Sequence, residues 1–464
     1  MAYRKFECVI CGFIYDEEKG LPEEGIAPGT SWDDVPDDWE CPECGVSKYD
    51  FEMVQTARFH KTLLPFNTPT SRCPNPRSYW VLMLTVASYG VVNNVVFSLL
   101  PLIGTELGLK ATQITLIGSC AALTVFLVSP WWGRKSDEWG RRISILIGVG
   151  GYCFSALLLV LFFSLSQAAL IGVDTLYVCL FASRLLQAFL IAAMLPAITA
   201  YVIDITTAEE RAVGLSQTGA AHGIGAIAGP SLVALAVWNL LAPLYIAVAL
   251  ALLIAVLVSL YLVEPTKRVV IAKSANKFKL SYFDPRYCYL LLVGVVIYLG
   301  MAVSTQMMGF YLPYVLDLDI AKSGASLGMT QALMAAATVF GQLVLVQRLS
   351  WQPLKLLKVG IPLMALGFVL LASAFSLIQL CAGVMLLGLG LGMSGPGFSA
   401  AVSLSVNPDE QGAIAGFLAA CPALGYVLGP FGAGALYEWY PRAPFVLVVL
   451  ILLAIWLVLF RKQS

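Results

Sequence analysis

Charged side chains are scarce in this sequence. Asp, Glu, Lys and Arg together make up 12% of its 464 residues, and hydrophobic residues make up 59%. Average soluble domains contain about 25% charged and about 45–50% apolar residues. The composition therefore excludes an ordinary soluble protein and predicts that most of the chain lies in a lipid bilayer.

The pattern of a cleavable signal peptide is also missing, because the first residues are polar and acidic and no apolar run follows them. The formal net charge is zero, but the charges are unevenly placed. Residues 1–55 hold 14 acidic and 4 basic side chains, so this segment carries −10 and the remainder +10. The imbalance predicts two parts, a small acidic head and a basic, very apolar body.

Two pairs of cysteines indicate a metal site in the head. The pairs are Cys8 with Cys11 and Cys41 with Cys44, each with the spacing C-x-x-C. Two such turns can bring four thiolates to the corners of a tetrahedron, the geometry that suits iron or zinc. So small a domain generally needs a metal to fold, and the spacing alone favours a zinc ribbon. The aromatic side chains expected in its core are Tyr15, Trp32, Trp39 and Phe51.

The head resembles rubredoxin over residues 1–55. The matching pieces are C-V-I-C-G-F-I-Y-D, G-I-A-P-G-T, D-D-W-E-C-P-E-C-G-V and K-Y-D-F-E. The resemblance implies a rubredoxin-like domain in which the four cysteines hold one iron ion (Fe2+ or Fe3+), with zinc as the alternative occupant. It also implies a one-electron carrier that exchanges electrons with a reductase or oxidase. Ile10 and Val46 would then cover the sulfurs.

The body follows a linker, rich in Pro, Ser and Thr, at residues 56–78. From there to the end, apolar runs of about 20 residues, the length that crosses a bilayer, recur twelve times. We expect the spans at 79–103, 112–132, 143–165, 175–203, 213–238, 243–263, 287–312, 324–347, 355–374, 377–402, 411–436 and 443–460. The sequence therefore predicts an all-α polytopic membrane domain of twelve transmembrane helices.

Basic residues lie mainly on one side of these spans. Four occur between the second and third spans, six near the central loop and three between the eighth and ninth spans, whereas the opposite side has three in all. Because Lys and Arg collect on the cytoplasmic side, both termini and the iron domain are predicted to be cytoplasmic, at the inner (plasma) membrane. The seven further cysteines are scattered and indicate no disulfide framework, which agrees with a reducing compartment.

A short motif repeats within the body at an offset of 200 residues. Its two copies are Gly225, Gly229 and Pro230, and Gly425, Gly429 and Pro430. Residues 79–263 and 287–464 are therefore predicted to be two copies of a six-helix half, joined by a cytoplasmic loop at 264–286. Two similar halves with a site between them at the midplane are typical of a rocking transporter.

Three segments of the body resemble the major facilitator superfamily. They are G-R-K-S-D-E-W-G-R-R at 133–142, the run that starts R-L-L-Q-A-F at 184–211, and the Gly-x3-Gly-Pro of the fifth span. The resemblance covers residues 79–464 and implies a twelve-helix secondary active transporter similar to drug/proton antiporters. Ala188 and Ser216 stand where the family usually has glycine, and the second half lacks the charged loop motif.

The loop motif predicts a cytoplasmic gate. Its members are Gly133, Asp137, Gly140, Arg141 and Arg142, with Asp204 at the end of the fourth span as a further partner. Asp137 can accept hydrogen bonds from the two arginines and from neighbouring N–H groups. We expect this latch to hold the outward-facing state closed on the cytoplasmic side and to break when the halves rock. The alternative is that these are ordinary charges of cytoplasmic loops.

Two ionisable residues are expected at mid-membrane depth. Arg184 and His222 each lie about ten residues into an apolar span, which at ~1.5 Å per residue is near the midplane. Such residues are costly in a bilayer and usually mark function. Every Asp and Glu of the body falls at a span end or in a loop. The nearest polar candidates are Asn93, Asn94 and Gln187, with Gln306 and Gln331 behind them.

A site with a fixed positive charge, an imidazole and no carboxylate favours an anionic or neutral polar substrate. An imidazole has an ordinary pKa near 6.5 and can carry a coupled proton. The alternatives are that Arg184 is a structural arginine and that His222 is a hydrogen-bonded core histidine.

Three functions fit these patterns. The first is proton-coupled export of a small, anionic organic molecule. The second is transport of an iron chelator of the siderophore type, coupled to iron reduction or sensing by the head. The third is a membrane-tethered electron carrier. The expected partners are a small-molecule substrate, protons, membrane lipid and the redox partner of the head, but not nucleic acid, and we expect no catalysis of a substrate reaction.

The cysteine pairs lead to a first prediction. Residues 1–55, produced alone in iron-replete cells, should bind one iron ion and be red when oxidised. Cys41→Ser should bleach the colour and destabilise the domain, because metal ligation contributes directly to folding in so small a unit. Metal analysis and a visible spectrum provide the check. A protein that holds only zinc and gives no redox-active iron on reconstitution would contradict the assignment.

Overall fold

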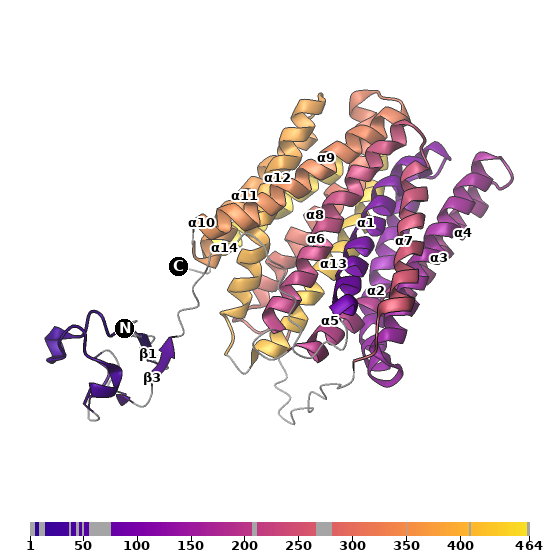
Figure 1. Ribbon diagram of the computed structural model, residues 1–464. Coiled ribbons are helices and arrows are strands. Elements are labelled where there is room, and N and C mark those ends of the chain that lie inside the picture. The colour runs from indigo at the N-terminus through magenta and orange to yellow at the C-terminus, as the bar shows by residue number, and fades with distance from the viewer. Residues whose placement is uncertain are drawn as a thin grey trace. The chain divides into compact units, whose positions relative to one another are not determined.

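The computed structural model describes residues 5–8, 14–36, 39–42, 46–48, 51–54, 76–206, 211–265, 281–349, 351–407 and 410–461. The chain divides into two compact units, Met1–Asn67 and Thr68–Ser464 (Figure 1). Each unit is described by itself.

The head contains a small antiparallel sheet with the strand order β2-β1-β3. The strands are β1 (Lys5–Cys8), β2 (Ile14–Asp16) and β3 (Phe51–Val54), and two single-turn helices, η1 (Pro22–Glu24) and η2 (Trp32–Asp34), lie between the second and third strands in the chain. Phe6 pairs with Tyr15 on one side and with Met53 on the other. Strands this short give a marginal sheet, so packing must supply stability.

Aromatic rings supply much of that packing in the head. The rings of Phe6 and Trp32 stack with centroids 4.5 Å apart, and Trp39 meets Trp32 edge-on at 5.9 Å. Tyr15 is fully buried, and its hydroxyl donates to the Thr30 carbonyl at 2.9 Å. Three of the four expected core aromatics are thereby confirmed. The Phe51 side chain lies outside the described residues.

The body is a helical bundle, and its described residues include 12 helices long and apolar enough to cross a membrane, as expected. The first half contains α1 (Pro76–Glu106), α2 (Ala111–Trp139), α3 (Arg141–Gln167), α4 (Val173–Ile191), α5 (Met194–Ile205), α6 (Arg211–Val233), η4 (Ala234–Val237) and α7 (Ala242–Tyr261). The second half contains α8 (Cys288–Leu316), α9 (Ile320–Phe340), η5 (Gly341–Val346), α10 (Gln347–Leu349), α11 (Pro353–Ala372), α12 (Leu377–Ser403), α13 (Gln411–Trp439) and α14 (Ala443–Arg461).

The fourth span differs from expectation because it is broken into α4 and α5 at Ala192 and Ala193. Pro196 explains the break. Its nitrogen cannot donate to the carbonyl of Ala192 four residues earlier, and its ring crowds that carbonyl. A span predicted as one helix therefore contains a kink at its middle.

The repeated glycine motif has the same packing role in both halves. A Cβ atom on Gly225 would lie 2.1 Å from the Ala87 carbonyl oxygen, so α6 touches the backbone of α1. A Cβ atom on Gly425 would lie 2.7 Å from the backbone of Tyr298 and Leu299, so α13 touches α8 in the same way. Small residues allow such close approach of membrane helices. The 200-residue offset therefore reflects two equivalent helix pairs.

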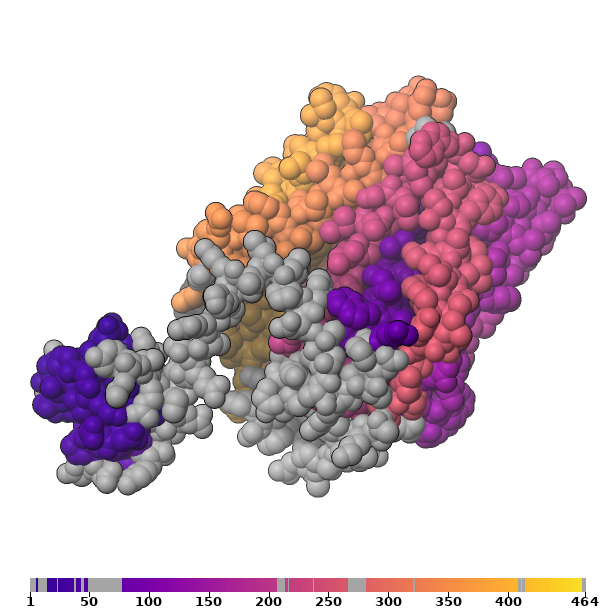
Figure 2. Space-filling model, in the orientation of Figure 1, coloured from indigo at the N-terminus to yellow at the C-terminus, as the bar shows by residue number. Residues whose placement is uncertain are grey.

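The two halves meet closely at one end of the bundle. We call the end that carries the α2–α3 turn the basic end and the opposite one the far end. At the far end, the Thr112 N–H donates to Glu438 Oε1 at 2.8 Å and joins α2 to α13. Gly309 of α8 packs against Pro101 of α1 at this end. In the upper part of Figure 2 the first-half helices, purple to pink, pack against the orange helices of the second half.

Close packing of α6 on α1 leads to a second prediction. Gly225→Ala should destabilise the bundle by about 1–3 kcal/mol, the usual effect of overpacking, because backbone and not a flexible side chain blocks the new methyl group. Gly223→Ala, in the same helix, is the matched control, since nothing lies within 4 Å of its Cβ position. Thermal unfolding in detergent measures both variants. Equal unfolding temperatures would contradict this packing.

Candidate functional site

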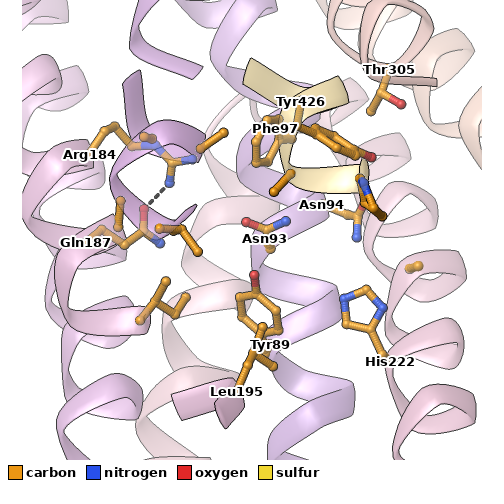
Figure 3. A pocket seen from close by; sticks show the side chains of 18 of the residues that line it. Tyr89, Asn93, Asn94, Phe97, Arg184, Gln187, Leu195, His222, Thr305 and Tyr426 are labelled. Carbon is orange, nitrogen blue, oxygen red and sulfur yellow. Dashed lines mark hydrogen bonds between the residues drawn. The ribbon is translucent and has the colours of Figure 1, made fainter. Parts of the chain in front are cut away.

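A cavity of about 390 Å³ lies between the two halves, near the middle of the helices (Figure 3). Its walls come from α1, α2, α4, α5 and α6 of the first half and from α8 and α13 of the second half. This volume is at the small end of the ~300–1,000 Å³ typical of small-molecule sites. The cavity is therefore large enough for a compact organic molecule.

All five residues predicted to handle substrate or proton line this cavity. They are Asn93, Asn94, Arg184, Gln187 and His222. Gln306 and Gln331, expected behind them, are buried but are not among the lining residues. Gln331 Nε2 donates to the Thr305 carbonyl at 3.2 Å. The structure thus brings together residues from three spans that the sequence could only place at similar depth.

Arg184 is the charged group of the cavity. Its side chain is 4% exposed, and its guanidinium lies over the ring of Phe97 at 5.6 Å from the centroid. Nη1 donates a hydrogen bond to Gln187 Oε1. Nε is buried and has no hydrogen-bond partner among the described residues. Within the described ranges the lining contains no Asp, Glu or second Arg or Lys, so the cavity carries one fixed positive charge.

His222 and Tyr89 lie together on a different part of the wall. Their ring centroids are 5.8 Å apart, and the His222 side chain is exposed towards the cavity (Figure 3). Asn94 is partly engaged, because its Nδ2 donates to the Gly90 carbonyl at 2.8 Å within the same helix. The imidazole is therefore accessible to a proton or a ligand that enters the cavity.

Four further lining residues were missed by the sequence reasoning. Tyr89 and Phe97 lie four residues before and after Asn93, so they share its helix face. Pro422 and Tyr426 stand at the 200-residue offset from His222 and Ala226, which also line the cavity. Helical spacing and the repeat were thus the available signals for these residues.

The loop motif forms a buried network around Arg141. Arg141 Nε donates to Asp204 Oδ2 at 3.1 Å, and Nη1 donates to Asp137 Oδ1 at 2.5 Å. Gly140 has φ +109°, a conformation that favours glycine. The expected Asp137 and Asp204 partners of Arg141 are found. Arg142 differs from expectation, because its Nη2 donates instead to the Ser259 carbonyl at 2.7 Å.

Glu264 is a member of this network that the sequence reasoning did not identify. Its two carboxylate oxygens accept the backbone N–H groups of Arg141 and Arg142, each at 2.8 Å, at the start of α3. A carboxylate is stabilised at that position because the first N–H groups of a helix lack partners within it. The carboxylate that receives backbone N–H groups here is therefore Glu264, where we had expected Asp137.

The contacts described for the loop motif lie within the first half. They join α2, α3, α5 and the segment after α7, and the Asp137 side chain remains 64% exposed. Gly133 has open space at its Cβ position, whereas a Cβ on Gly140 would meet Glu264. In this conformation the network braces the basic end of one half while the two halves are joined at the far end.

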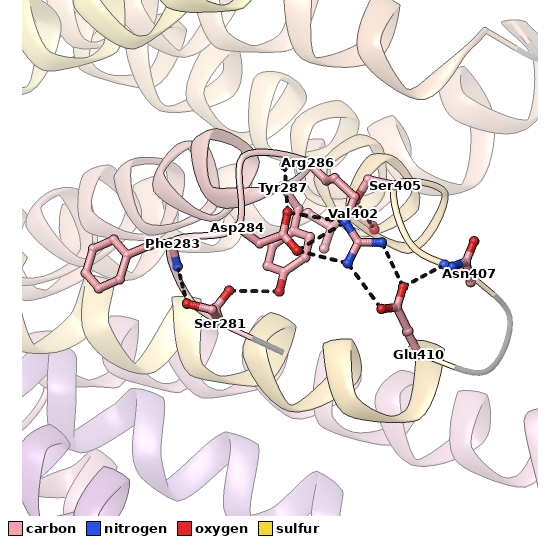
Figure 4. A network of polar contacts seen from close by, with 9 residues as sticks. All are labelled: Ser281, Phe283, Asp284, Arg286, Tyr287, Val402, Ser405, Asn407 and Glu410. Atoms are coloured by element: carbon pink, nitrogen blue, oxygen red, sulfur yellow. Dashed lines mark hydrogen bonds and ion pairs between the residues drawn. The ribbon is translucent and has the colours of Figure 1, made fainter. Parts of the chain in front are cut away.

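The second half has a different ion-pair cluster at its basic end (Figure 4). Arg286 donates from Nη1 and Nη2 to the carboxylate oxygens of Glu410 at 2.9 and 3.1 Å, and from Nε to Asp284 Oδ2 at 3.1 Å. The Arg286 hydrogen bonds, with the Asn407 N–H as a further donor, lower the pKa of Glu410. A lowered carboxyl pKa strengthens folding at neutral pH and loses this effect as the pH falls through it. Arg286 thus joins α13 to the segment before α8.

The described residues include part of the expected metal site of the head. Cys41 is 2% exposed, lies in the aromatic core and forms no disulfide. Cys8 ends β1, whereas Cys11, Cys44 and the cover residue Ile10 lie outside the described residues. Val46 packs against the core. A donor set of four thiolates is the set that iron or zinc takes in a tetrahedral site, so the residues present fit such a metal.

Two six-helix halves around a cavity near the middle of their helices are typical of a membrane carrier. The sequence pattern of the Major Facilitator Superfamily matches residues 82–377 and 295–464, and that of rubredoxin matches residues 5–51. The chain therefore belongs to the Major Facilitator Superfamily and carries an N-terminal rubredoxin domain, as expected.

Individual proteins agree with both assignments. The head is 64% identical over 52 residues to a rubredoxin of Acinetobacter baylyi, which covers 11% of this chain and 96% of that protein. The body is 28% identical over 368 residues to multidrug resistance protein 1 of Bacillus subtilis, which covers 78% of this chain and 90% of that protein. The crystal structure of nucleoside transporter NupG superposes with a TM-score of 0.65 at 13% identity and covers 84% of this chain and 100% of that one. The fold is thus that of a twelve-helix transporter with a rubredoxin iron domain.

The Arg141 network leads to a third prediction. Asp204→Asn should lower the free energy of unfolding by about 3–5 kcal/mol, because the Asp204 and Arg141 side chains are 1% and 7% exposed and the arginine would lose a buried partner. Asp137→Asn is the matched control. The ion pair of the exposed Asp137 side chain with Arg141 should contribute only about 0–1 kcal/mol to the free energy of unfolding. Thermal unfolding in detergent distinguishes the two, and equal losses would show that burial does not set their importance.

Proposed function

We propose that the protein is a proton-coupled exporter of a small organic anion. The observation that carries the proposal is Arg184, a buried guanidinium in the central cavity whose Nε has no partner among the described residues. A charge at bilayer depth is costly unless something pairs with it. Because the described lining offers no carboxylate, a bound anion is the natural partner.

The shape of the guanidinium favours a carboxylate among the anions. Arginine presents a planar fork of N–H donors that matches two carboxylate oxygens. Gln187 occupies one donor at Nη1. The Nε side of the fork is left for the substrate, and Asn93 lies on the same cavity wall to accept or donate a further hydrogen bond.

His222 is the proposed proton carrier. It faces the cavity beside Tyr89, on α6, whereas Arg184 is on α4. Proton-driven export needs the proton and the substrate to occupy the carrier in turn, so a proton taken up by His222 from the outside would be carried inward after the anion has left. Imidazole is the side chain whose charge changes most readily near neutral pH. Export would then be driven by protons that return through the same cavity.

Export is the proposed direction, and orientation and resemblance support it. By the positive-inside rule, the basic end and both termini would lie in the cytoplasm. The halves are joined at the far end in this structure, so this conformation would receive substrate from the cytoplasm. The Gly-x3-Gly-Pro motif resembles that of antiporters, and the similar Bacillus protein is called a multidrug resistance protein. We propose that the half braced by the Asp137–Arg141–Asp204 network closes against the second half at the basic end when the halves rock.

The head is proposed to be a cytoplasmic one-electron carrier. Its iron would be held by Cys8, Cys11, Cys41 and Cys44, as in the rubredoxins it resembles. Thiolate ligation and an apolar, aromatic surrounding allow iron to change charge by one unit with little rearrangement of the site.

Arg184 provides the test of this function. In vesicles that contain the purified protein and a pH gradient, Arg184→Gln should abolish transport of labelled organic anions while the protein remains folded. Arg184→Lys should rescue poorly, because ammonium is a point charge and not a fork. Arg348→Gln, which removes an exposed arginine at the basic end, is the control and should transport normally. Resistance of expressing cells to lipophilic cations that survives Arg184→Gln would contradict the anion assignment.

A further inference from the structure

The polar groups of the cavity are distributed unevenly between its two walls. The first half contributes Arg184, Gln187, His222 and the two asparagines. The second half contributes Met301, Thr305, Pro422, Ala423 and Tyr426. The Thr305 hydroxyl already donates to the Met301 carbonyl at 2.9 Å, so apart from the Tyr426 hydroxyl this wall offers little polarity. A ligand that satisfies both walls needs a polar end and an apolar body.

An aromatic pair stands where these two walls meet. Phe97 of α1 and Tyr426 of α13 lie with ring centroids 6.4 Å apart at 75°, an edge-to-face arrangement that joins the two halves. The same Phe97 ring lies under the Arg184 guanidinium. A carboxylate held by Arg184 therefore has aromatic surface directly beside it (Figure 3), and aromatic rings bind other rings favourably by stacking or edge contacts.

The charge of the cavity limits the charge of its ligand. Arg184 is the one fixed cation in the described lining. It can form an ion pair with a single carboxylate, and a second carboxylate would find no other fixed cation in the described lining. An unpaired ionised group in such surroundings is strongly disfavoured. His222 can offset part of a second charge only when it is protonated, so the neutral imidazole leaves Arg184 as the only cation in the described lining.

We propose that the cavity selects amphipathic monocarboxylates, with the carboxylate on Arg184 and an aromatic or aliphatic body against Tyr426 and Met301. This inference rests on the proposed anion transport and names its substrate class. It excludes di- and tricarboxylates, and with them metal chelates of the polycarboxylate kind. Tyr426 is then a specificity-determining residue that acts on the body of the substrate and not on its charge.

Equilibrium binding to the purified full-length protein tests the proposal. Isothermal titration at neutral pH would compare acetate, benzoate and 2-naphthoate, which share one charge and differ in apolar size, with phthalate and citrate, which carry more charges. Affinity should rise from acetate to 2-naphthoate. Phthalate and citrate should bind at least ~10-fold more weakly than benzoate, since each tenfold corresponds to about 1.4 kcal/mol.

Variants separate the two parts of the site. Tyr426→Ala should weaken the binding of 2-naphthoate by ~10-fold and leave the binding of acetate unchanged. Tyr426→Phe should retain the binding of 2-naphthoate. Tyr245→Ala on α7, a half-exposed tyrosine outside the cavity lining, is the control and should change neither.

The outcomes distinguish this inference from the proposed function. Phthalate or citrate that binds as tightly as benzoate would overturn the single-charge inference, and the anion function would stand if Arg184→Gln abolished that binding. Equal affinities of acetate and 2-naphthoate would overturn the amphipathic part. Benzoate binding that survives Arg184→Gln, or no binding of any of these anions, would overturn the proposed function and this inference with it.

Discussion

An arginine lies buried near the middle of a membrane-spanning helix, and among the described residues no carboxylate lies beside it; the proposed function depends on this. Two contacts reduce the free-energy cost of burying the Arg184 charge. They are a hydrogen bond to Gln187 and the face of the Phe97 ring. Both are weaker than an ion pair. The Nε–H group of Arg184 still has no partner among the described residues. A substrate that binds and is then released would supply one.

The rest of the bundle places this charge between the two halves of the transporter. Gly225 and Gly425 let α6 and α13 touch α1 and α8 backbone to backbone, so each half can act as a rigid unit. The halves are joined at the far end through Thr112 and Glu438. Different ion-pair networks, around Arg141 in one half and Arg286 in the other, brace the basic end of each half. Rigid units joined at one end can rock about the cavity between them.

Much of this organisation could be predicted from the sequence because the bilayer restricts what each residue type can do. Twelve spans, two halves and the depth of Arg184 and His222 follow from apolar length, a fixed offset and the rarity of charge. The position of Tyr426 in the cavity could not be predicted in the same way, because the sequence of a uniformly apolar span does not indicate which of its faces lines the cavity. The Arg286–Glu410 pair joins residues far apart in sequence, and the role of Glu264 depends on where α3 begins. Pro196 indicated that the fourth span could be broken. Whether the helix breaks there also depends on its packing against neighbouring helices, which the sequence does not show.

The most direct test of the central claim is an experimental structure of the full-length protein with 4-iodobenzoate, whose iodine can be located independently of the rest of the molecule. If Arg184 binds the substrate carboxylate, one ligand should lie in the central cavity, with its carboxylate within hydrogen-bond distance of Arg184 and its iodine directed towards Tyr426. A ligand bound in the cavity with its carboxylate away from Arg184, or bound only elsewhere on the protein, would contradict it.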